Sequence, residues 1–174
     1  MDLVTALAIS IGLLGGLATW LFFGPLAGMG IGLTLWAAFI AWGSFYHCGG
    51  KTSGLQNSVL SNIWGAIIGG LTMYALGATG NGGSLGLPLG AAICVAIGVF
   101  VLVMGSKIPL FPSIPAAVYG FAATVALALA TNAGVNAYFA PSLANPIINI
   151  SLSMIVGGLF GYVSEQLAGM LAKR

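Results

Sequence analysis

The stretch LGLPLGAAICVAIGVFVLVM, residues 85–104, decides the class of fold, because it is an apolar run without a charged side chain. About 20 mostly apolar residues in a helix cross the hydrocarbon core of a bilayer, which is roughly 30 Å thick. The whole chain has this character: 59% of its residues are hydrophobic, 3% are charged, and the mean hydropathy is +1.10. A soluble domain has roughly a quarter of its residues charged. The composition therefore predicts an integral membrane protein.

Five further apolar stretches accompany this one. The six predicted spans are Leu3–Phe23, Ala27–Tyr46, Val59–Leu76, Leu85–Met104, Pro115–Thr131 and Ile147–Leu171. The segments between them are rich in Gly, Pro and Asn, which favour turns. We therefore expect an all-α integral membrane protein with six transmembrane helices, folded as a single transmembrane domain over residues 1–174.

The positive charges predict the orientation of these spans. Lys51 follows the second span, Lys107 follows the fourth, and Lys173 and Arg174 follow the sixth. Six spans place both termini on one side of the membrane, and all four charges lie on that side. Because connections rich in Lys and Arg stay in the cytoplasm, both termini are expected to be cytoplasmic.

An internal repeat relates the third span to the sixth. At a shift of 92 residues, NSVLSNIWG (57–65) aligns with NISLSMIVG (149–157), and each continues to a second glycine one turn later. Halves of three spans each would have opposite orientations, as in many transporters. We therefore predict a 3+3 inverted repeat, with halves of approximately residues 1–80 and 81–174. Glycines let membrane helices approach closely, and the predicted packing positions are Gly65, Gly69, Gly157 and Gly161.

Catalytic and metal-binding patterns are not evident in the sequence. One histidine and two acidic residues are too few for most general acid–base schemes. Two lone cysteines, Cys48 and Cys94, make neither a disulfide framework nor a metal site. We expect no enzymatic activity, no cofactor, no bound metal and no nucleic-acid partner. The expected partners are the lipid bilayer, a small-molecule solute and further copies of the chain.

Polar side chains at membrane depth are costly and often mark a pathway. The candidates for a pathway are Asn57, Ser61, Asn62, Ser113, Asn149 and Ser153. Asn57 and Asn149, related by the repeat, either face a solute or cap their helices. Ser61 and Ser153 lie one turn further along. Their hydroxyls either line the pathway or form a hydrogen bond with a carbonyl of their own helix. Asn62 has no polar counterpart, which predicts a place at one mouth alone.

Three ionisable residues are candidates for gating or for attracting a solute. His47 either gates entry or is a solvated loop residue. Glu165, the one acid within a span, either pairs with Lys173 or Lys107 at the interface or faces a cavity. Lys107 lies just before an unusual proline-rich segment, where a helix start beside it would favour an anion or a carbonyl oxygen.

That segment, residues 107–115, contains three prolines at intervals of three and cannot form a regular helix. It either dips into the protein, with Ser113 capping the helix that follows, or forms an ordinary cytoplasmic turn. The connection over residues 132–146 is long and uncharged. Its aromatic pair, Tyr138 and Phe139, indicates that it lies at the membrane interface or plugs a mouth.

The chain resembles the YcdZ-like proteins, a family of small bacterial inner-membrane proteins. The resemblance rests on three features. The second span ends in an aromatic pair, Phe45–Tyr46, followed by the glycine pair Gly49–Gly50, and the third and sixth spans share a pattern of Asn and Gly. The entry to the fifth span, Phe111–Pro115, is rich in proline. It implies a bacterial inner-membrane location and no particular substrate. In size and span number the chain is also similar to the six-helix urea/amide and acetate–succinate channels, in architecture only.

These patterns predict a channel or facilitator for a small polar solute, neutral or anionic, formed by a homo-oligomer. The scarcity of carboxylates at membrane depth argues against cation-coupled transport. The alternative is a non-conducting membrane scaffold or accessory subunit that uses glycine-rich helix faces to contact partners. A polar-lined tube would favour the channel, and a filled bundle with exposed glycine grooves would favour the scaffold.

Overall fold

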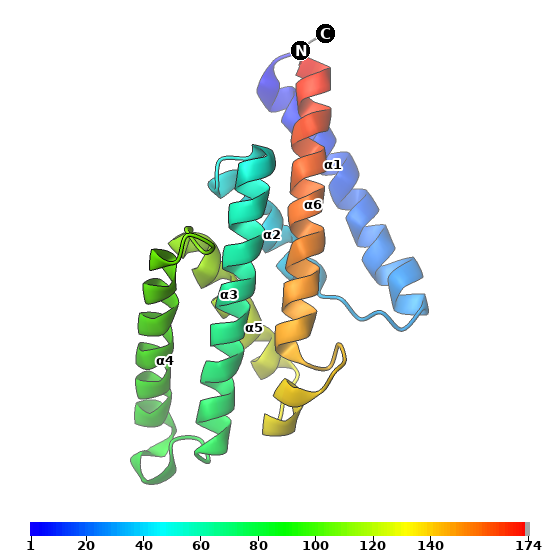
Figure 1. Ribbon diagram of the computed structural model, residues 1–174. Coiled ribbons are helices and arrows are strands. Elements are labelled where there is room, and N and C mark those ends of the chain that lie inside the picture. Colours follow the sequence, from blue (N-terminus) through cyan, green and yellow to red (C-terminus); the bar gives the residue numbers. More distant parts are fainter. Residues whose placement is uncertain (173–174) are drawn as a thin grey trace.

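The computed structural model describes residues 1–172, which form six α-helices and, within that range, no β-strand (Figure 1). The helices are α1 (Leu3–Leu21), α2 (Leu35–His47), α3 (Lys51–Ala78), α4 (Gly86–Met104), α5 (Ile114–Ala130) and α6 (Pro146–Ala172). Shorter helical turns lie between them: a π-helical segment at Phe22–Leu26 and 3-10 turns at Gly83–Leu85, Gly105–Lys107 and Val135–Phe139. The expected all-helical class is confirmed. Lys173 and Arg174, two of the four positive charges, lie outside the described residues.

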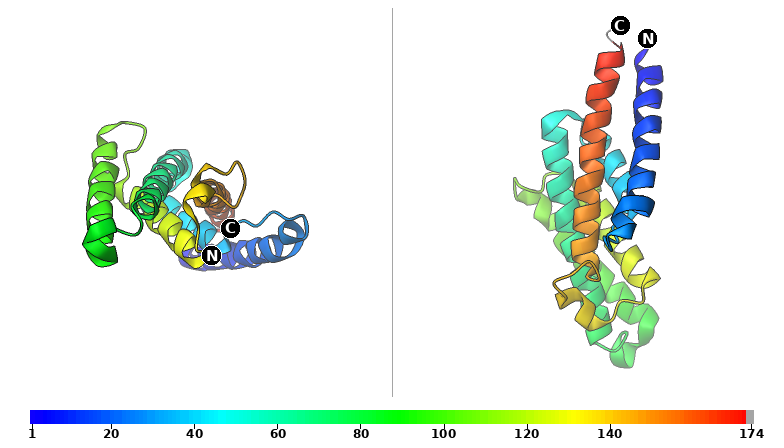
Figure 2. Two further views of the ribbon diagram at one scale, coloured as in Figure 1. Left: turned by 90° about the horizontal axis from the view of Figure 1, so that it is seen from below. Right: turned by 90° about the vertical axis from the view of Figure 1, so that its right-hand side faces the viewer.

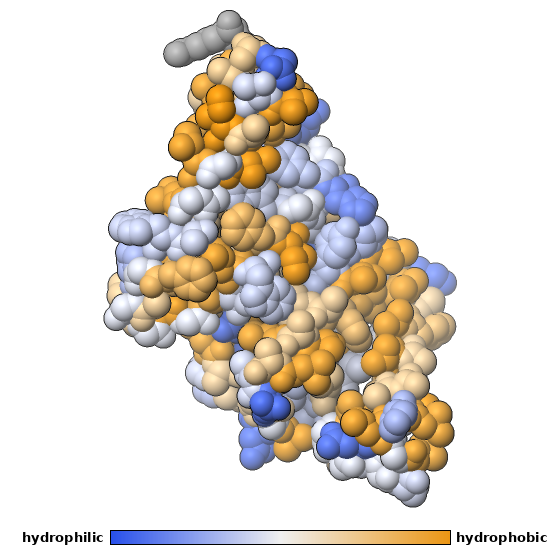
Figure 3. Space-filling view, turned by 180° about the vertical axis from the view of Figure 1, so that it is seen from behind, coloured by the Kyte–Doolittle hydropathy of each residue, from blue (hydrophilic) through white to orange (hydrophobic). Residues whose placement is uncertain are grey.

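Four stretches of helix are long and apolar enough to cross a membrane. They are Leu3–Leu26, Lys51–Ala78, Gly83–Lys107 and Pro146–Ala172. Many of their apolar side chains are exposed on the surface of the protein. For example, Leu13 of α1 is 71% exposed and Phe100 of α4 is 67% exposed. Apolar residues cover much of the face seen in Figure 3. Apolar surface of this extent is typical of a protein embedded in lipid.

The other two helices, α2 and α5, are short. They have 13 and 17 residues, so at 1.5 Å per residue they are about 20 and 25 Å long, less than the hydrocarbon thickness. The predicted second span, Ala27–Tyr46, is wrong at its start, because residues 31–34 are not helical. Gly30 has a φ of +74°, which an α-helix cannot contain, and neighbouring glycines further weaken helix formation.

The third helix begins earlier than predicted, at Lys51 rather than at Val59. The residues of its first turns are polar, so hydropathy excluded them from the predicted span. In the structure these residues are helical nevertheless. The carboxylate of Glu165 on α6 accepts a hydrogen bond from the backbone N–H of Lys51, 2.7 Å away, and so pairs one of the free N–H groups at the helix start. Asn57 consequently lies well inside α3 and does not cap it.

The long helices α3 and α6 pack against each other, and each carries one short helix. α5 lies along α3, α2 lies along α6, α4 covers α3 on its outer side, and α1 packs on α6 (Figures 1 and 2). The start of α1 and the end of α6 lie side by side in all three ribbon views. Each half of the chain therefore places its short helix on the long helix of the other half.

Two repeat-related glycines, Gly65 and Gly157, make equivalent contacts in the two halves. A Cβ added at Gly65 of α3 would overlap the backbone carbonyl of Ala117 on α5, and one added at Gly157 of α6 would overlap that of Ala38 on α2. Gly69 also faces a backbone, that of Phe121, whereas its repeat partner Gly161 faces the Phe45 side chain. Only glycine permits such close approach of two helices. The sequence repeat thus has a counterpart in packing.

Candidate functional site

The non-helical segments before α2 and α5 end in the same way. Thr34 and Ser113, the last residues before the two helices, have nearly the same φ and ψ angles, −96° and 102° against −100° and 98°. The Thr34 N–H donates to the Ser153 hydroxyl on α6 at 2.8 Å, and the Ser113 N–H donates to the Ser61 hydroxyl on α3 at 3.2 Å. The repeat-related serines therefore hold the starts of the two short helices in equivalent positions.

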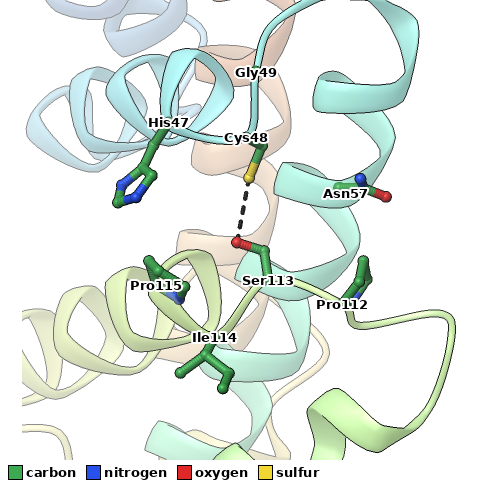
Figure 4. Close-up of a pocket in the computed structure, with 8 residues that line it drawn as sticks. All are labelled: His47, Cys48, Gly49, Asn57, Pro112, Ser113, Ile114 and Pro115. Carbon is green, nitrogen blue, oxygen red and sulfur yellow. Dashed lines mark hydrogen bonds between the residues drawn. The ribbon is translucent and has the colours of Figure 1, made fainter.

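An open pocket of about 560 Å³ lies at the start of α5 (Figure 4). We name it the α5-start pocket; its lining comes from the end of α2 and the following turn (residues 47–49), from Asn57 of α3 and from residues 112–115. The Ser113 hydroxyl accepts from the Ala116 N–H at 3.4 Å, which confirms the predicted helix cap. The Cys48 thiol donates to the same hydroxyl at 3.3 Å, and Figure 4 shows the two side chains pointing toward each other.

Two further groups of this pocket bear on its chemistry. Nδ1 of His47 lies 2.8 Å from the Tyr119 hydroxyl, which joins the end of α2 to α5. The Asn57 side chain is half-buried, and within residues 1–172 no protein group hydrogen-bonds to its amide. Figure 4 shows this amide on the side away from the Cys48–Ser113 contact. Asn57 therefore brings an unpaired amide, which has both donors and an acceptor, to the lining of the pocket.

A second pocket, of about 480 Å³, lies at the start of α2. We name it the α2-start pocket; it is lined by Gly32 and Thr34, by Asn149 of α6, and by residues of the connection between α5 and α6. Asn149 is 5% exposed and fully engaged. Its amide nitrogen donates to the carbonyls of Gly32 (2.7 Å) and Leu143 (3.1 Å), and its oxygen accepts from the Thr34 hydroxyl (2.8 Å). The repeat partners Asn57 and Asn149 thus lie in equivalent pockets with different surroundings.

The connection between α5 and α6 covers the α2-start pocket. Asn145 organises it by donating to the Tyr138 carbonyl at 2.8 Å and by accepting from the Ile147 N–H at 2.9 Å. The Tyr138 side chain is buried, whereas that of Phe139 is 70% exposed. Burial raises the pKa of the Tyr138 hydroxyl. Leu143 of this connection lines the pocket.

Buried apolar side chains fill the space between the two pockets. The cluster consists of Ala37, Ala41, Ala66, Ala123, Ile150 and Met154, none more than 1% exposed. Tyr119 and Leu127 pack against it. Tyr119 bonds to His47 of the α5-start pocket, and Leu127 lines the α2-start pocket, so the cluster separates the two. In the conformation described, the pockets are not joined through this cluster.

Asn62 takes no part in either pocket. It is fully buried between α2 and α3, where its amide nitrogen donates to the Ser58 hydroxyl at 3.2 Å and its oxygen accepts from Ser44 at 3.3 Å. Ser58 in turn donates to Ser44 at 2.9 Å. The three side chains thus pair with one another, and none of them lines either pocket.

Lys107 and Glu165 also lie outside both pockets. Lys107 is exposed at the end of a 3-10 turn. Glu165 is engaged at the start of α3, as described above, and Lys173, one of its expected partners, is outside the described residues. Beside Glu165, the buried Ser164 hydroxyl accepts from the Trp42 indole at 2.9 Å and lies 2.7 Å from the Tyr46 hydroxyl.

Sequence reasoning missed four residues that shape these sites. Thr34 is the counterpart of Ser113, Cys48 bonds to Ser113, and Tyr119 holds His47. Trp64 anchors the segment before α5: its indole donates to the Leu102 carbonyl at 3.1 Å and stacks on Phe111, with ring centroids 5.0 Å apart. Thr34 could have been found from the similarity of TLWAA (34–38) to SIPAA (113–117).

A family model matches residues 8–169, which include both pockets and the cluster between them. This chain belongs to that family. The family is described as a protein of unknown function, DUF1097, and so it supplies no substrate. No curated protein and no solved structure matches the chain. Any functional assignment therefore has to rest on the geometry of the two pockets.

Proposed function

We propose that the protein is a channel or facilitator for a small polar solute, neutral or anionic. The observation that carries this proposal is the pair of equivalent pockets, one at the start of each short helix, with Asn57 and Ser113 in one and Asn149 and Thr34 in the other. Inverted repeats give a bundle equivalent features in its two halves, and in many transporters the pathway lies at the interface between the repeats. The apolar cluster between them then represents the closed state.

The proposed topology has six crossings, with a 3+3 inverted repeat and cytoplasmic termini. Four long apolar helices and the adjacent positions of the α1 start and the α6 end support it. The short helices α2 and α5 would complete their crossings with non-helical segments. Such backbone is tolerated at membrane depth where protein groups satisfy it, as Ser61 and Ser153 do here. Following the YcdZ-like resemblance, we place the protein in a bacterial inner membrane.

The chemistry of the pockets sets the class of solute. Neither lining contains Asp, Glu, Lys or Arg among the described residues; hydroxyls, amides, a thiol and an imidazole provide the polar contacts. Pores lined in this way suit solutes that form hydrogen bonds and carry no positive charge, and a helix start favours anions or carbonyl oxygens.

Opening would require movement within the apolar cluster. Four of its six members are alanines, so Met154 and Ile150, both on α6, are its bulky side chains. A modest rotation or shift of α6 against α2 and α5 would move these two side chains. We therefore assign the gate to Met154 and Ile150.

A scaffold or accessory subunit is the second candidate, and two observations favour it. The cluster between the pockets is fully packed. A Cβ added at Gly12 or Gly16 on α1 would meet nothing within 4 Å, so these glycines form an open small-residue face on which a partner helix or a second copy fits. A homo-oligomer is compatible with both candidates.

Stopped-flow light scattering on proteoliposomes tests the proposal. Urea, glycerol, formate and acetate are compared between vesicles with the protein and empty vesicles. The proposal expects at least one solute to cross faster with the protein, and expects Asn57→Leu and Asn149→Leu to slow it. Rates equal to those of empty vesicles for every solute favour the scaffold instead.

A further inference from the structure

The α2-start pocket shows what an asparagine in this position binds. Asn149 donates from its amide nitrogen to two carbonyls and accepts at its oxygen from a hydroxyl, so both ends of the amide are paired. One of these carbonyls belongs to Leu143, which lies in the long connection between α5 and α6 and not in the segment before α2. The connection therefore supplies a built-in carbonyl ligand to Asn149.

Among residues 1–172, the chain supplies no equivalent ligand to Asn57 in the α5-start pocket, although Cys48 and Gly49 of the matching connection line it. There the matching connection, between α2 and α3, consists of residues 48–50 alone and turns directly from one helix into the next. Asn57 therefore lacks, within the described residues, the carbonyl ligand that Leu143 provides to Asn149. Asn57 lines a pocket of about 560 Å³ with its amide half-buried.

We propose that the α5-start pocket binds a small uncharged amide or urea at Asn57. The ligand's carbonyl oxygen accepts from the Asn57 amide nitrogen, as the Leu143 carbonyl does from Asn149, and its N–H donates to the Asn57 oxygen, as the Thr34 hydroxyl does to Asn149. This ligand is one member of the solute class given under the proposed function, and its transport across the membrane rests on that proposed function. The binding itself does not depend on transport.

The surroundings favour an amide over a carboxylate or a polyol. No Lys or Arg lines the pocket, so a carboxylate would meet only the partial positive charge of the α5 start and the His47 imidazole in place of a full counter-ion. A carboxylate also has no N–H for the Asn57 oxygen, which its own oxygens would repel. A polyol offers hydroxyls but no carbonyl, and it cannot form the planar two-bond pair of two amides. Charge and hydrogen-bond pattern thus select the amide.

Protection of Cys48 from alkylation tests this proposal without any flux measurement. Cys48 is half-buried in the pocket with its sulfur 3.3 Å from the Ser113 hydroxyl, and Cys94 is replaced by alanine so that one thiol remains. Alkylation by a small maleimide is timed in detergent micelles with acetamide, urea, acetate or glycerol. Because the free fraction of the protein is 1/(1 + [L]/Kd), a ligand at about four times its Kd slows labelling about five-fold.

We expect acetamide and urea to protect Cys48 and expect acetate and glycerol at the same concentration to leave the rate unchanged. Asn57→Leu removes the protection, whereas Gln56→Leu, the same change at the exposed neighbouring position, retains it. If Asn57→Leu does not fold, Asn57→Asp, which keeps the size and loses the N–H donor, replaces it.

Equal protection by acetate or glycerol overturns the proposal, and so does protection that persists without the Asn57 amide. The two proposals fail separately. Protection without flux in vesicles would contradict the channel and leave the binding site standing. Flux of glycerol or acetate without amide protection would contradict the binding site and leave the channel standing.

Discussion

The hydroxyl of Ser153 lies 2.8 Å from the backbone nitrogen of Thr34, although 119 positions separate the two residues in the chain. Ser61 makes the same contact with the backbone nitrogen of Ser113. Each bond fixes the point where non-helical chain becomes a short helix. The two pockets exist because these starts are held against α6 and α3.

Loss of the Ser153 hydroxyl should destabilise the protein. Ser153→Ala leaves the part-buried Thr34 N–H without its acceptor. An unpaired buried donor lowers the free energy of unfolding by about 1–3 kcal/mol. Heat or SDS unfolding of the purified protein in detergent measures the change. Ser151→Ala on the same helix, at a half-buried position, is the control and should lie within about 0.5 kcal/mol of the wild type. Equal midpoints for the two variants would contradict the assigned role.

Substitution of the repeat-related glycines should be strongly unfavourable. Gly65→Ala and Gly157→Ala each place a Cβ onto a backbone carbonyl of the facing helix, which cannot move away without shifting that helix. We expect a loss of about 2 kcal/mol or more for each variant.

Gly169→Ala provides the matched control on α6, because nothing lies within 4 Å of the added methyl group. It should raise stability slightly, by up to about 1 kcal/mol, since alanine is the better helix former. The same unfolding measurement serves for all three variants. A loss at Gly169 as large as that at Gly157 would show that helix approach is not the cause.

The two pockets should open to opposite sides of the membrane. In a Cys94→Ala background, Cys48 reports on the α5-start pocket, and Asn132→Cys with Cys48→Ala reports on the α2-start pocket. A membrane-impermeant thiol reagent should label Cys48 from the cytoplasmic side and the cysteine at position 132 from the outside. Labelling of both from one side would contradict the inverted repeat.

Hydropathy predicted the helical class and the approximate places of all six helices. It could not predict that α2 is short, because residues 27–34 are as apolar as a span; the break comes from the left-handed backbone at Gly30. It also missed the polar first turns of α3, whose start is paired by Glu165 from a distant helix. Both errors concern contacts and backbone angles that apolar content does not encode.

The repeat was visible in the sequence only in part. One shift aligns Asn57 and Ser61 with Asn149 and Ser153, but the long connection before α6 changes the shift needed for the short helices. A search at one shift therefore could not relate Thr34 to Ser113. Of the six pathway candidates predicted from the sequence, five lie at or beside the two helix starts. The sixth, Asn62, lies in a closed network with Ser44 and Ser58.

The most direct test of the central claim, a pathway that joins the two pockets through the apolar cluster, is solute flux through the Met154→Ala variant. Met154 is fully buried in that cluster, whereas Met170, on the same helix, is 67% exposed. Truncation at Met154 is expected to cost about 2–5 kcal/mol in stability, so folding is checked first by unfolding midpoint. In stopped-flow measurements on proteoliposomes, we expect urea to cross faster through Met154→Ala than through the wild type, and Met170→Ala to match the wild type. Folded Met154→Ala protein with urea rates no higher than those of empty vesicles would contradict the claim.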